Sequence, residues 1–287
     1  MAIPRKRFLV PALGAGALAA GALASPLVAQ TRPIRTADPD PLPHGQLAVE
    51  TGVEWLDEVA FPLSGLEGDL LRAPAIAFRL GLGGLAEFQV AGGLDLLFID
   101  DRRPAPFADM VQVDGDLSHD IYDPVVATKV RLQRETERWP SMGLRVATRL
   151  PSASNKSGLG TDTTDFFLWV MAAKTLGRAR LLANLGLGVL AVPTRGDRQN
   201  DVLMYGLAAE RPLSERWTLA LEVNGRTDRS SGETPEGTED MGQARFAARW
   251  SAGAIALDGG LIAGLHGPEP NIGATVGMSW LVDARLD

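Results

Sequence analysis

The stretch Trp217–Gly225, WTLALEVNG, alternates apolar and polar side chains. One side carries apolar residues: Trp217, Leu219, Leu221 and Val223. The other side carries small or polar residues: Thr218, Ala220, Glu222 and Asn224. A repeat of two residues is typical of a β-strand. In a soluble sheet the apolar side forms the core, whereas in a membrane barrel it faces lipid and the polar side lines the interior. One strand does not distinguish these two arrangements.

The first 29 residues resemble a secretory signal peptide. Arg5, Lys6 and Arg7 precede an apolar run from Phe8 to Ala24, and small residues follow. We expect cleavage after Ala24 or Ala29 and treat residues 1–29 as outside the fold. The alternative is a membrane anchor, but the run is short, rich in Gly and interrupted by Pro11. Residues 30–45 contain several prolines and predict an extended periplasmic segment leading into the barrel.

Composition excludes several classes of protein. The chain has 287 residues, 45% of them hydrophobic, with 32 Gly, no Cys and a formal net charge of −7. The absence of Cys excludes disulfides, thiolate metal ligands and thiol catalysis. The acidic balance argues against nucleic acid as a partner. The longest later apolar run, Phe166–Ala173, is far shorter than the roughly 18 to 20 residues of a spanning helix.

The period-two pattern recurs along residues 46–287, which we predict to form one β-barrel domain. Each stretch is near the roughly nine to eleven residues that a tilted strand needs to cross a bilayer. Gly is frequent inside the stretches, which also argues against helices. Including Trp217–Gly225, twelve strands are expected: 46–56, 73–82, 85–98, 125–133, 142–150, 165–174, 180–190, 202–211, 217–225, 243–250, 254–265 and 272–282.

The connections between these strands alternate in length. Those after odd-numbered strands are expected to be long and polar: 57–72, 99–120, 152–163, 191–201, 226–240 and a shorter one at 266–271. Those after even-numbered strands are expected to be tight: 83–84, 134–140, 175–178, 212–216 and 251–253. Outer-membrane barrels have short periplasmic turns and longer external loops, so this alternation favours the membrane barrel.

The less apolar face of the strands carries Gly, Ala, Ser and Thr with isolated charges, which is typical of a barrel interior. Charges in a low-dielectric wall have to be solvated or paired. They either set the selectivity of an open pore or pair across the interior and brace a closed barrel. The predicted lumen-lining residues are Glu50, Glu54, Arg79, Glu87, Gln89, Lys129, Arg131, Arg145, Arg149, Arg180, Asn184, Glu210, Glu222, Asn224, Arg245, Arg249 and Asp258.

Five of the six tryptophans lie near predicted strand ends, where membrane barrels carry aromatic girdles. The predicted interfacial residues are Trp55, Trp139, Trp217, Trp250 and Trp280. The apolar face of Trp217–Gly225 is therefore expected to meet lipid.

Four stretches resemble an outer-membrane barrel family of transporters, named for the MetA pathway of phenol degradation. They are GLRVATRLPSAS (143–154), GLGTDTTDF (158–166), NLGLGVL (184–190) and the long stretch 201–225. The resemblance implies a channel that passes small hydrophobic or aromatic molecules, and it extends more distantly to fatty-acid uptake channels. Such barrels usually end on an aromatic residue that the insertion machinery recognises, whereas this sequence continues past Trp280 to Asp287.

No catalytic constellation is apparent, and we predict neither enzyme activity, nor a cofactor, nor a metal site. His44, His119 and His266 are widely spaced and fall in predicted connections. There is no nucleophile elbow and no phosphate-binding loop. We therefore predict an outer-membrane barrel that passes small, hydrophobic or aromatic solutes by passive diffusion, with outer-membrane lipid and the barrel insertion machinery as partners. The alternative is a non-conducting structural or adhesive barrel whose external loops, particularly 99–120 and 226–240, bind a partner.

Overall fold

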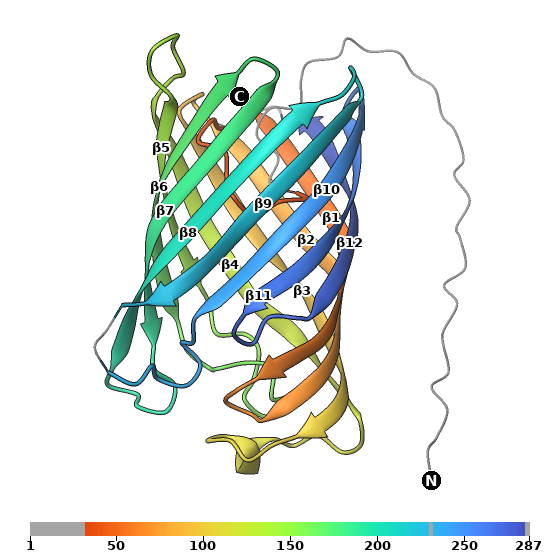
Figure 1. Ribbon diagram of the computed structural model, residues 1–287, viewed down its shortest axis with the longest axis vertical. Coiled ribbons are helices and arrows are strands. Elements are labelled where there is room, and N and C mark those ends of the chain that lie inside the picture. Colours follow the sequence, from red (N-terminus) through yellow and green to blue (C-terminus); the bar gives the residue numbers. More distant parts are fainter. Residues whose placement is uncertain (1–31, 230–231, 285–287) are drawn as a thin grey trace, which may run out of the picture.

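The computed structural model describes residues 32–229 and 232–284, and the chain forms a closed antiparallel barrel of twelve strands (Figure 1). The predicted all-β, up-and-down architecture is confirmed. A 3-10 turn, η1 (Ala108–Met110), lies between the third and fourth strands. The strands are β1 (Gln46–Phe61), β2 (Leu66–Leu82), β3 (Ala86–Arg102), β4 (Leu117–Gln133), β5 (Ser141–Arg149), β6 (Asp165–Leu176), β7 (Ala179–Ala191), β8 (Gln199–Pro212), β9 (Trp217–Asp228), β10 (Met241–Ala252), β11 (Ile255–His266) and β12 (Ile272–Asp283).

Each strand pairs with its sequence neighbours, and β1 pairs with β12 to close the barrel. Val53 on β1 stands opposite Val276 on β12. Closure matters because an open sheet edge would leave unpaired backbone N–H and C=O groups, which lipid does not satisfy. We call the end that carries the connections after even-numbered strands the turn end, and the opposite end the loop end; the turn end is uppermost in Figure 1.

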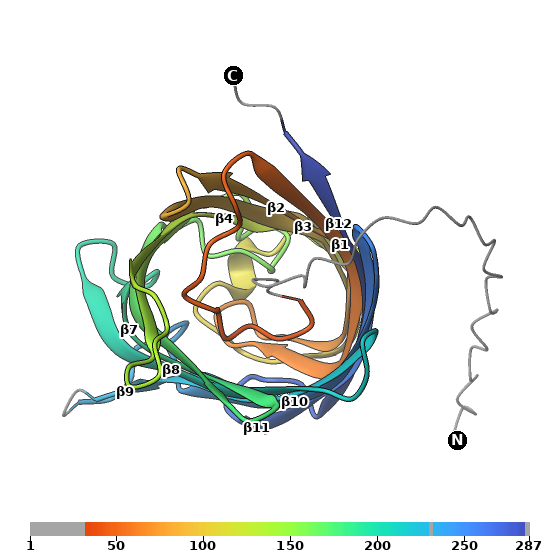
Figure 2. The same cartoon turned by 90° about the horizontal axis from the view of Figure 1, so that it is seen from above.

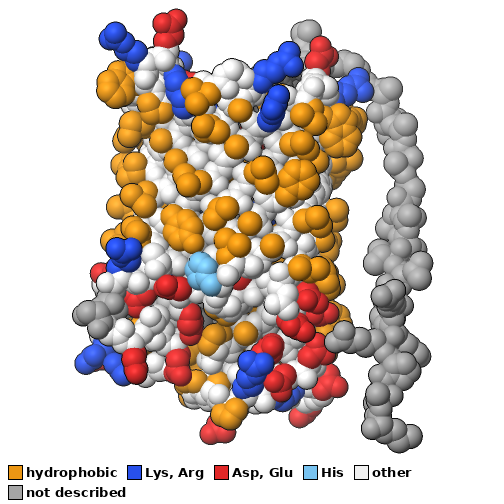
Figure 3. Space-filling model, viewed as in Figure 1, with side chains coloured by type: hydrophobic (Ala, Val, Ile, Leu, Met, Phe, Trp, Pro, Cys, Tyr) orange, Lys and Arg blue, Asp and Glu red, His pale blue; other side chains and the backbone are white. Residues whose placement is uncertain are grey.

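The barrel is apolar outside and polar inside. On β9, Leu221 is 59% exposed while its neighbour Glu222 is 3% exposed. The same alternation holds on β10, where Phe246 is exposed and Arg245 is buried. On the face seen in Figure 3, hydrophobic side chains form a band across the outer wall, and charged side chains lie above and below it, mostly basic above and mostly acidic below. An exposed apolar belt of this extent is typical of a surface that meets lipid rather than water.

The first two hairpins are taller than the sequence pattern indicates. The predicted loops 57–72 and 99–120 are wrong in part, because β1 continues to Phe61, β2 begins at Leu66, β3 continues to Arg102 and β4 begins at Leu117. The connection 62–65 is therefore shorter than the turn-end connection 134–140, and the strict alternation of loop length fails there. Polar residues lie in these strand extensions, beyond the apolar band, which is why the pattern resembles a loop.

The N-terminal part of the chain departs from expectation. Residues 32–45 precede β1 as predicted, but they fold back into the barrel instead of remaining outside it (Figure 2). The predicted signal peptide, residues 1–29, lies outside the described residues.

Four of the five predicted interfacial tryptophans gather at the turn end. Trp217 and Trp250 are register partners there, Trp280 lies near the end of β12, and Trp139 lies in the connection 134–140. Trp55 faces outward farther along β1, toward the loop end. The aromatic residues therefore mark one rim of the apolar band more strongly than the other.

Among the described residues, no helix has the length and apolar character needed to cross a membrane.

Candidate functional site in the barrel lumen

The lumen is occupied by residues 32–45, which we call the inner segment (Figure 2). At the turn end the Gly45 amide donates to the Gly81 carbonyl at 3.0 Å, which fixes the segment to β2 just before it becomes β1. From there the segment runs inward to Arg32, whose guanidinium contacts Asp258 and Thr275 on β11 and β12. Both ends of the segment therefore lie beside β1, whose two neighbours are β2 and β12, and the residues between them loop across the lumen to β7 and β9.

Glu222 on β9 is the main acceptor for the middle of the inner segment. The Arg35 amide donates to both carboxylate oxygens at 3.0 and 2.9 Å. The Thr36 amide also donates to Glu222, and the Thr36 hydroxyl donates at 2.5 Å. Because Glu222 is buried, these donors replace the water that the carboxylate would otherwise need.

A second anchor surrounds the two aspartates of the inner segment. Arg180 on β7 reaches Asp38 Oδ2 at 2.5 Å and Asp40 Oδ2 at 2.9 Å. Lys129 on β4 donates to the backbone carbonyls of the same two residues at 3.1 and 2.9 Å. Arg131 lies 3.4 Å from Asp40 Oδ1. Charge-assisted hydrogen bonds of this kind fix position more firmly than neutral ones.

Apolar side chains hold the inner segment as well. Ile34 is 3% exposed and packs against a patch of small and apolar residues on the wall: Ala173, Leu182, Ala208 and Ala220. Leu42 is 1% exposed, and its amide donates to Glu87 at 2.8 Å. The segment is therefore packed as a protein interior is packed, and not merely tethered.

Inward-facing glycines make room for it. A Cβ on Gly206 would lie 2.6 Å from Thr36 Oγ1, and one on Gly81 would lie 2.0 Å from the Pro43 carbonyl oxygen. The glycines on the wall whose Cβ would meet the inner segment are Gly52, Gly81, Gly143, Gly206 and Gly277. These glycines belong to the small residues of the predicted interior face, and the backbone of the inner segment lies against them.

Other interior charges form ion pairs that connect strands of the wall with one another and, through Arg35, with the inner segment. Arg79 lies 2.7 Å from Glu50 and 3.6 Å from Glu87, and all three are buried. Glu54 lies within 4 Å of three guanidinium groups, at 2.8 Å from Arg245, 3.2 Å from Arg72 and 3.6 Å from Arg35. Buried pairs of this kind satisfy charges that would be costly alone, and they brace the wall.

The basic residues on β4 and β5 do not form one open patch, because most of them pair with carboxylates. Lys129 lies 3.3 Å from Glu87, Arg131 contacts Asp40, and Arg149 pairs with Asp165. Arg145 differs from them, because no ion pair to a described carboxylate is formed by its guanidinium. Its Nε donates to Gln89 Oε1 at 2.8 Å.

Two cavities lie in the lumen beside the inner segment. One, of about 280 Å³, lies between the inner segment and β1 to β5, and we call it the inner chamber. The other, of about 370 Å³, lies toward the loop end, and we call it the outer chamber. Both are lined by Arg35, Arg72 and Tyr122, so these three side chains stand at their boundary.

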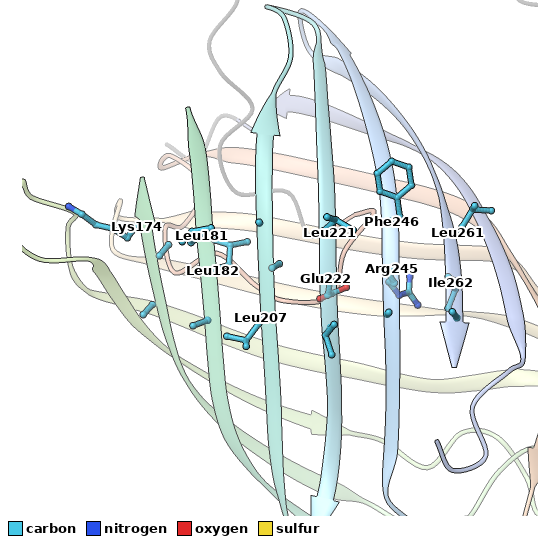
Figure 4. Close-up of a pocket in the computed structure, with 18 of the residues that line it drawn as sticks. Lys174, Leu181, Leu182, Leu207, Leu221, Glu222, Arg245, Phe246, Leu261 and Ile262 are labelled. Carbon is cyan, nitrogen blue, oxygen red and sulfur yellow. The ribbon is translucent and has the colours of Figure 1, made fainter. Parts of the chain in front are cut away.

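A further hollow, of about 980 Å³, lies on the barrel wall across β6 to β12 (Figure 4). A row of seven outward-facing register partners crosses it, and four of them are alanines. The row is Ala172, Ala183, Leu207, Val223, Ala244, Ala263 and Ile272. The small side chains of this row leave a shallow furrow beside larger outward-facing side chains such as Leu221 and Phe246. In Figure 4 each of these stands next to a polar neighbour on the same strand, Leu221 to Glu222 and Phe246 to Arg245. Lipid chains would fill a furrow of this kind in a bilayer, so we place the candidate site in the lumen.

The predicted lumen-lining residues are buried or half-buried, and ten of them touch the inner segment: Glu54, Glu87, Lys129, Arg131, Arg180, Asn184, Glu222, Arg245, Arg249 and Asp258. Arg249 donates to the Arg32 carbonyl and also lies 3.5 Å from Glu210. Asn224 makes no hydrogen bond through its amide nitrogen to the described residues.

Sequence reasoning missed the partners that complete these contacts. Asp38 and Asp40 were assigned to a segment outside the barrel, and Arg72 to a loop. Trp169 lies in the stretch Phe166–Ala173, which is apolar on both faces, so periodicity does not assign its side chain to either face. The register does, since Trp169 stands opposite Arg145 and the guanidinium carbon lies 4.9 Å from the ring centroid.

Within the described ranges, no group of three or more His, Asp or Glu side chains is arranged to hold a metal ion. His44 lies at the turn end, where its Nδ1 accepts a hydrogen bond from the Gly83 amide at 3.0 Å. His119 and His266 lie on β4 and β11, and not in connections as predicted.

Solved structures with this architecture are similar to the chain. An outer membrane channel from Pseudomonas putida F1 superposes with a TM-score of 0.57 at 15% identity, over 85% of this chain and 98% of that one. The NanC porin superposes with a TM-score of 0.50 at 11% identity, over 82% of this chain and 98% of that one. Likeness at this level establishes the fold, that of outer-membrane β-barrels, and not the activity. No protein-family model matches the chain, and no curated protein is significantly similar to it.

Proposed function

We propose that this protein is a channel of the bacterial outer membrane that passes small, hydrophobic or aromatic solutes by passive diffusion, and that the inner segment narrows its lumen. The turn end would face the periplasm and the loop end the exterior, as in other barrels of this type. Residues 1–29 would serve as the cleaved export signal. The likeness of four stretches to the barrel family of the phenol-degradation pathway supports this class of solute.

The observation that carries the proposal is the pair of chambers inside a polar lumen. They extend from the loop end toward the middle of the barrel and share a boundary at Arg35, Arg72 and Tyr122. Beyond the inner chamber, the inner segment and its anchors fill the lumen on the turn side. A solute from outside would therefore enter the outer chamber and then the inner chamber, and it would pass farther only when the segment shifts or leaves a narrow gap.

The ion pairs favour a second candidate, a barrel braced shut that serves a structural or adhesive role. Arg79, Glu50 and Glu87 form such a brace, and the anchors of the inner segment add to it. In this alternative the loop-end connections would bind a partner and no solute would cross.

Conductance separates the two candidates. The full chain and a variant lacking residues 32–44 would be inserted into planar bilayers, with liposome swelling by phenols, aromatic acids and sugars as a second measurement. A channel closed by its inner segment gives small steps in the full chain and larger steps in the deletion variant. A deletion variant that is folded, as judged by heat-modifiable gel mobility, but shows no steps and no swelling would refute the channel.

A further inference from the structure

The inner chamber has the size and the lining of a binding site for a small planar molecule. Its volume is about 280 Å³, whereas a cavity of about 150 Å³ is enough to hold benzene. Apolar residues line part of it, among them Ala37 from the inner segment and Ala75 and Ala77 from β2. A single aromatic ring would fit against this part of the wall.

Arg145 brings an unmatched positive charge to the same chamber. In the row of register partners across β3 to β6, Glu87 stands opposite Lys129, Lys129 opposite Arg145, and Arg145 opposite Trp169. Glu87 carries the one carboxylate of this row, and it lies 3.3 Å from Lys129 and 3.6 Å from Arg79. Among the described residues, Arg145 therefore has no carboxylate partner of its own, and Gln89 and Trp169 are its contacts.

The contacts of Arg145 orient it without neutralising it. Its Nε donates to Gln89 at 2.8 Å, and its guanidinium lies over the Trp169 ring at 4.9 Å. The two terminal nitrogens make no hydrogen bond to a described residue, and Arg145 lines the chamber. A guanidinium held at its Nε and by its flat face presents a fork of N–H groups that matches the two oxygens of a carboxylate.

The surroundings add to this positive potential. Glu54 lies within 4 Å of Arg35, Arg72 and Arg245, and Arg72 also pairs with Asp95 at 2.7 Å, so two carboxylates face three cations at the chamber wall. The Arg35 side chain is 46% exposed. Arg72 stacks on Tyr122 at 4.4 Å, which keeps the boundary between the chambers both aromatic and basic. An anion entering from the outer chamber would pass these groups before it reached Arg145.

We propose that the inner chamber binds the carboxylate form of a single-ring aromatic acid, with the carboxylate on the free edge of Arg145 and the ring against Ala37, Ala75 and Ala77. The inference rests on the proposed channel and names its solute class more narrowly. A neutral phenol would use only the apolar wall of the site, and a short aliphatic acid would use only the Arg145 guanidinium.

Isothermal titration calorimetry of the full chain in detergent micelles tests the site with three probes: benzoate, phenol and acetate. Benzoate is expected to bind about tenfold or more tighter than phenol or acetate, because a hydrogen-bonded charge pair contributes at least that factor. Arg145→Gln is expected to weaken benzoate binding by about tenfold or more and to leave phenol binding unchanged. Arg145→Lys keeps the charge but loses the fork, and it is expected to fall between the two.

Arg149→Gln is the matched control, since Arg149 lies on the same strand, is paired with Asp165 and does not line the inner chamber. It should leave benzoate affinity unchanged. Heat-modifiable gel mobility would verify that each variant is folded; if Arg145→Gln does not fold, Arg145→Lys and the three-probe comparison on the unaltered chain carry the test. Equal binding of benzoate and phenol, or undiminished benzoate binding by a folded Arg145 variant, would overturn the site.

Binding in micelles does not depend on conduction, so the two proposals fail separately. Benzoate binding by a barrel that never conducts would support the binding site and refute the channel. Conduction without benzoate binding would support the channel and refute the binding site.

Discussion

Removing the Glu222 carboxylate is expected to release the inner segment from the wall. In Glu222→Ala the amides of Arg35 and Thr36 and the Thr36 hydroxyl lose their shared acceptor. Hydrogen bonds to a charged group contribute about 1.5 to 3 kcal/mol each. The three hydrogen bonds share one carboxylate, and burying that carboxylate is itself costly. We therefore expect the free energy that holds the inner segment on the wall to fall by about 3 kcal/mol in total.

A loss of about 3 kcal/mol changes the ratio of docked to undocked segment by about a hundredfold. The absence of Cys in the chain allows a direct measurement, because Ala37→Cys introduces its sole thiol at a buried position of the segment. The labelling rate of that thiol by a membrane-impermeant maleimide should rise by about a hundredfold when Glu222→Ala is added. Conductance steps in planar bilayers should become larger or more frequent in parallel.

Asp165→Asn provides the control. Asp165 is also a buried lumen carboxylate, but it pairs with Arg149 and accepts from the Ala191 amide at 3.0 Å, without contact to the inner segment. Its replacement should leave the labelling rate of the Ala37→Cys thiol unchanged. A labelling rate that Glu222→Ala does not change, or one that both substitutions raise equally, would refute the role assigned to Glu222.

Three further outcomes are expected. Gly206→Val adds a Cβ that would lie 2.6 Å from Thr36 Oγ1, so it should displace the inner segment and raise conductance, which bilayer recording would detect. Leu207→Lys places a charge on a side chain that is 62% exposed on the outer wall, and it should lower the free energy of unfolding in lipid vesicles by about 2 to 4 kcal/mol at mid-bilayer depth, as urea titration would measure. Burial raises the pKa of Glu135, in the connection 134–140, but hydrogen bonds from Thr175 and the nearby Arg180 hold it below its ordinary value of 4.5. The contribution of Glu135 to stability is therefore full above about pH 4.5 and is lost as the pH falls through the lowered pKa, and Glu135→Gln should abolish this part of the acid dependence of unfolding.

The periodicity of single strands was enough to predict the wall. The alternation in Trp217–Gly225 and its eleven counterparts is a local property, because neighbouring side chains on a strand point to opposite faces whatever the strand pairs with. The exposed Leu221 and the buried Glu222 follow that rule. Strand ends were less predictable, since polar residues in β1 and β2 extend beyond the apolar band and resemble loop residues.

The sequence also indicated which face carries the interior charges, but not what they contact. Asp38 and Asp40 lie far along the chain from Arg180, and no local pattern connects them. The inward glycines were recognised as small residues of an interior, yet the backbone that fills the space beside Gly81 and Gly206 became visible only in three dimensions.

What the sequence by itself determined is therefore the barrel: its strand number and its inside-out polarity. Only the tertiary structure decided that the inner segment occupies the lumen, and that Arg145, unlike Lys129 and Arg180, has no carboxylate partner among the described residues. The physical reason is the range of the interactions. Side-chain alternation is set by the backbone within a few residues, whereas ion pairing and cavity shape depend on groups brought together from opposite walls of a closed barrel.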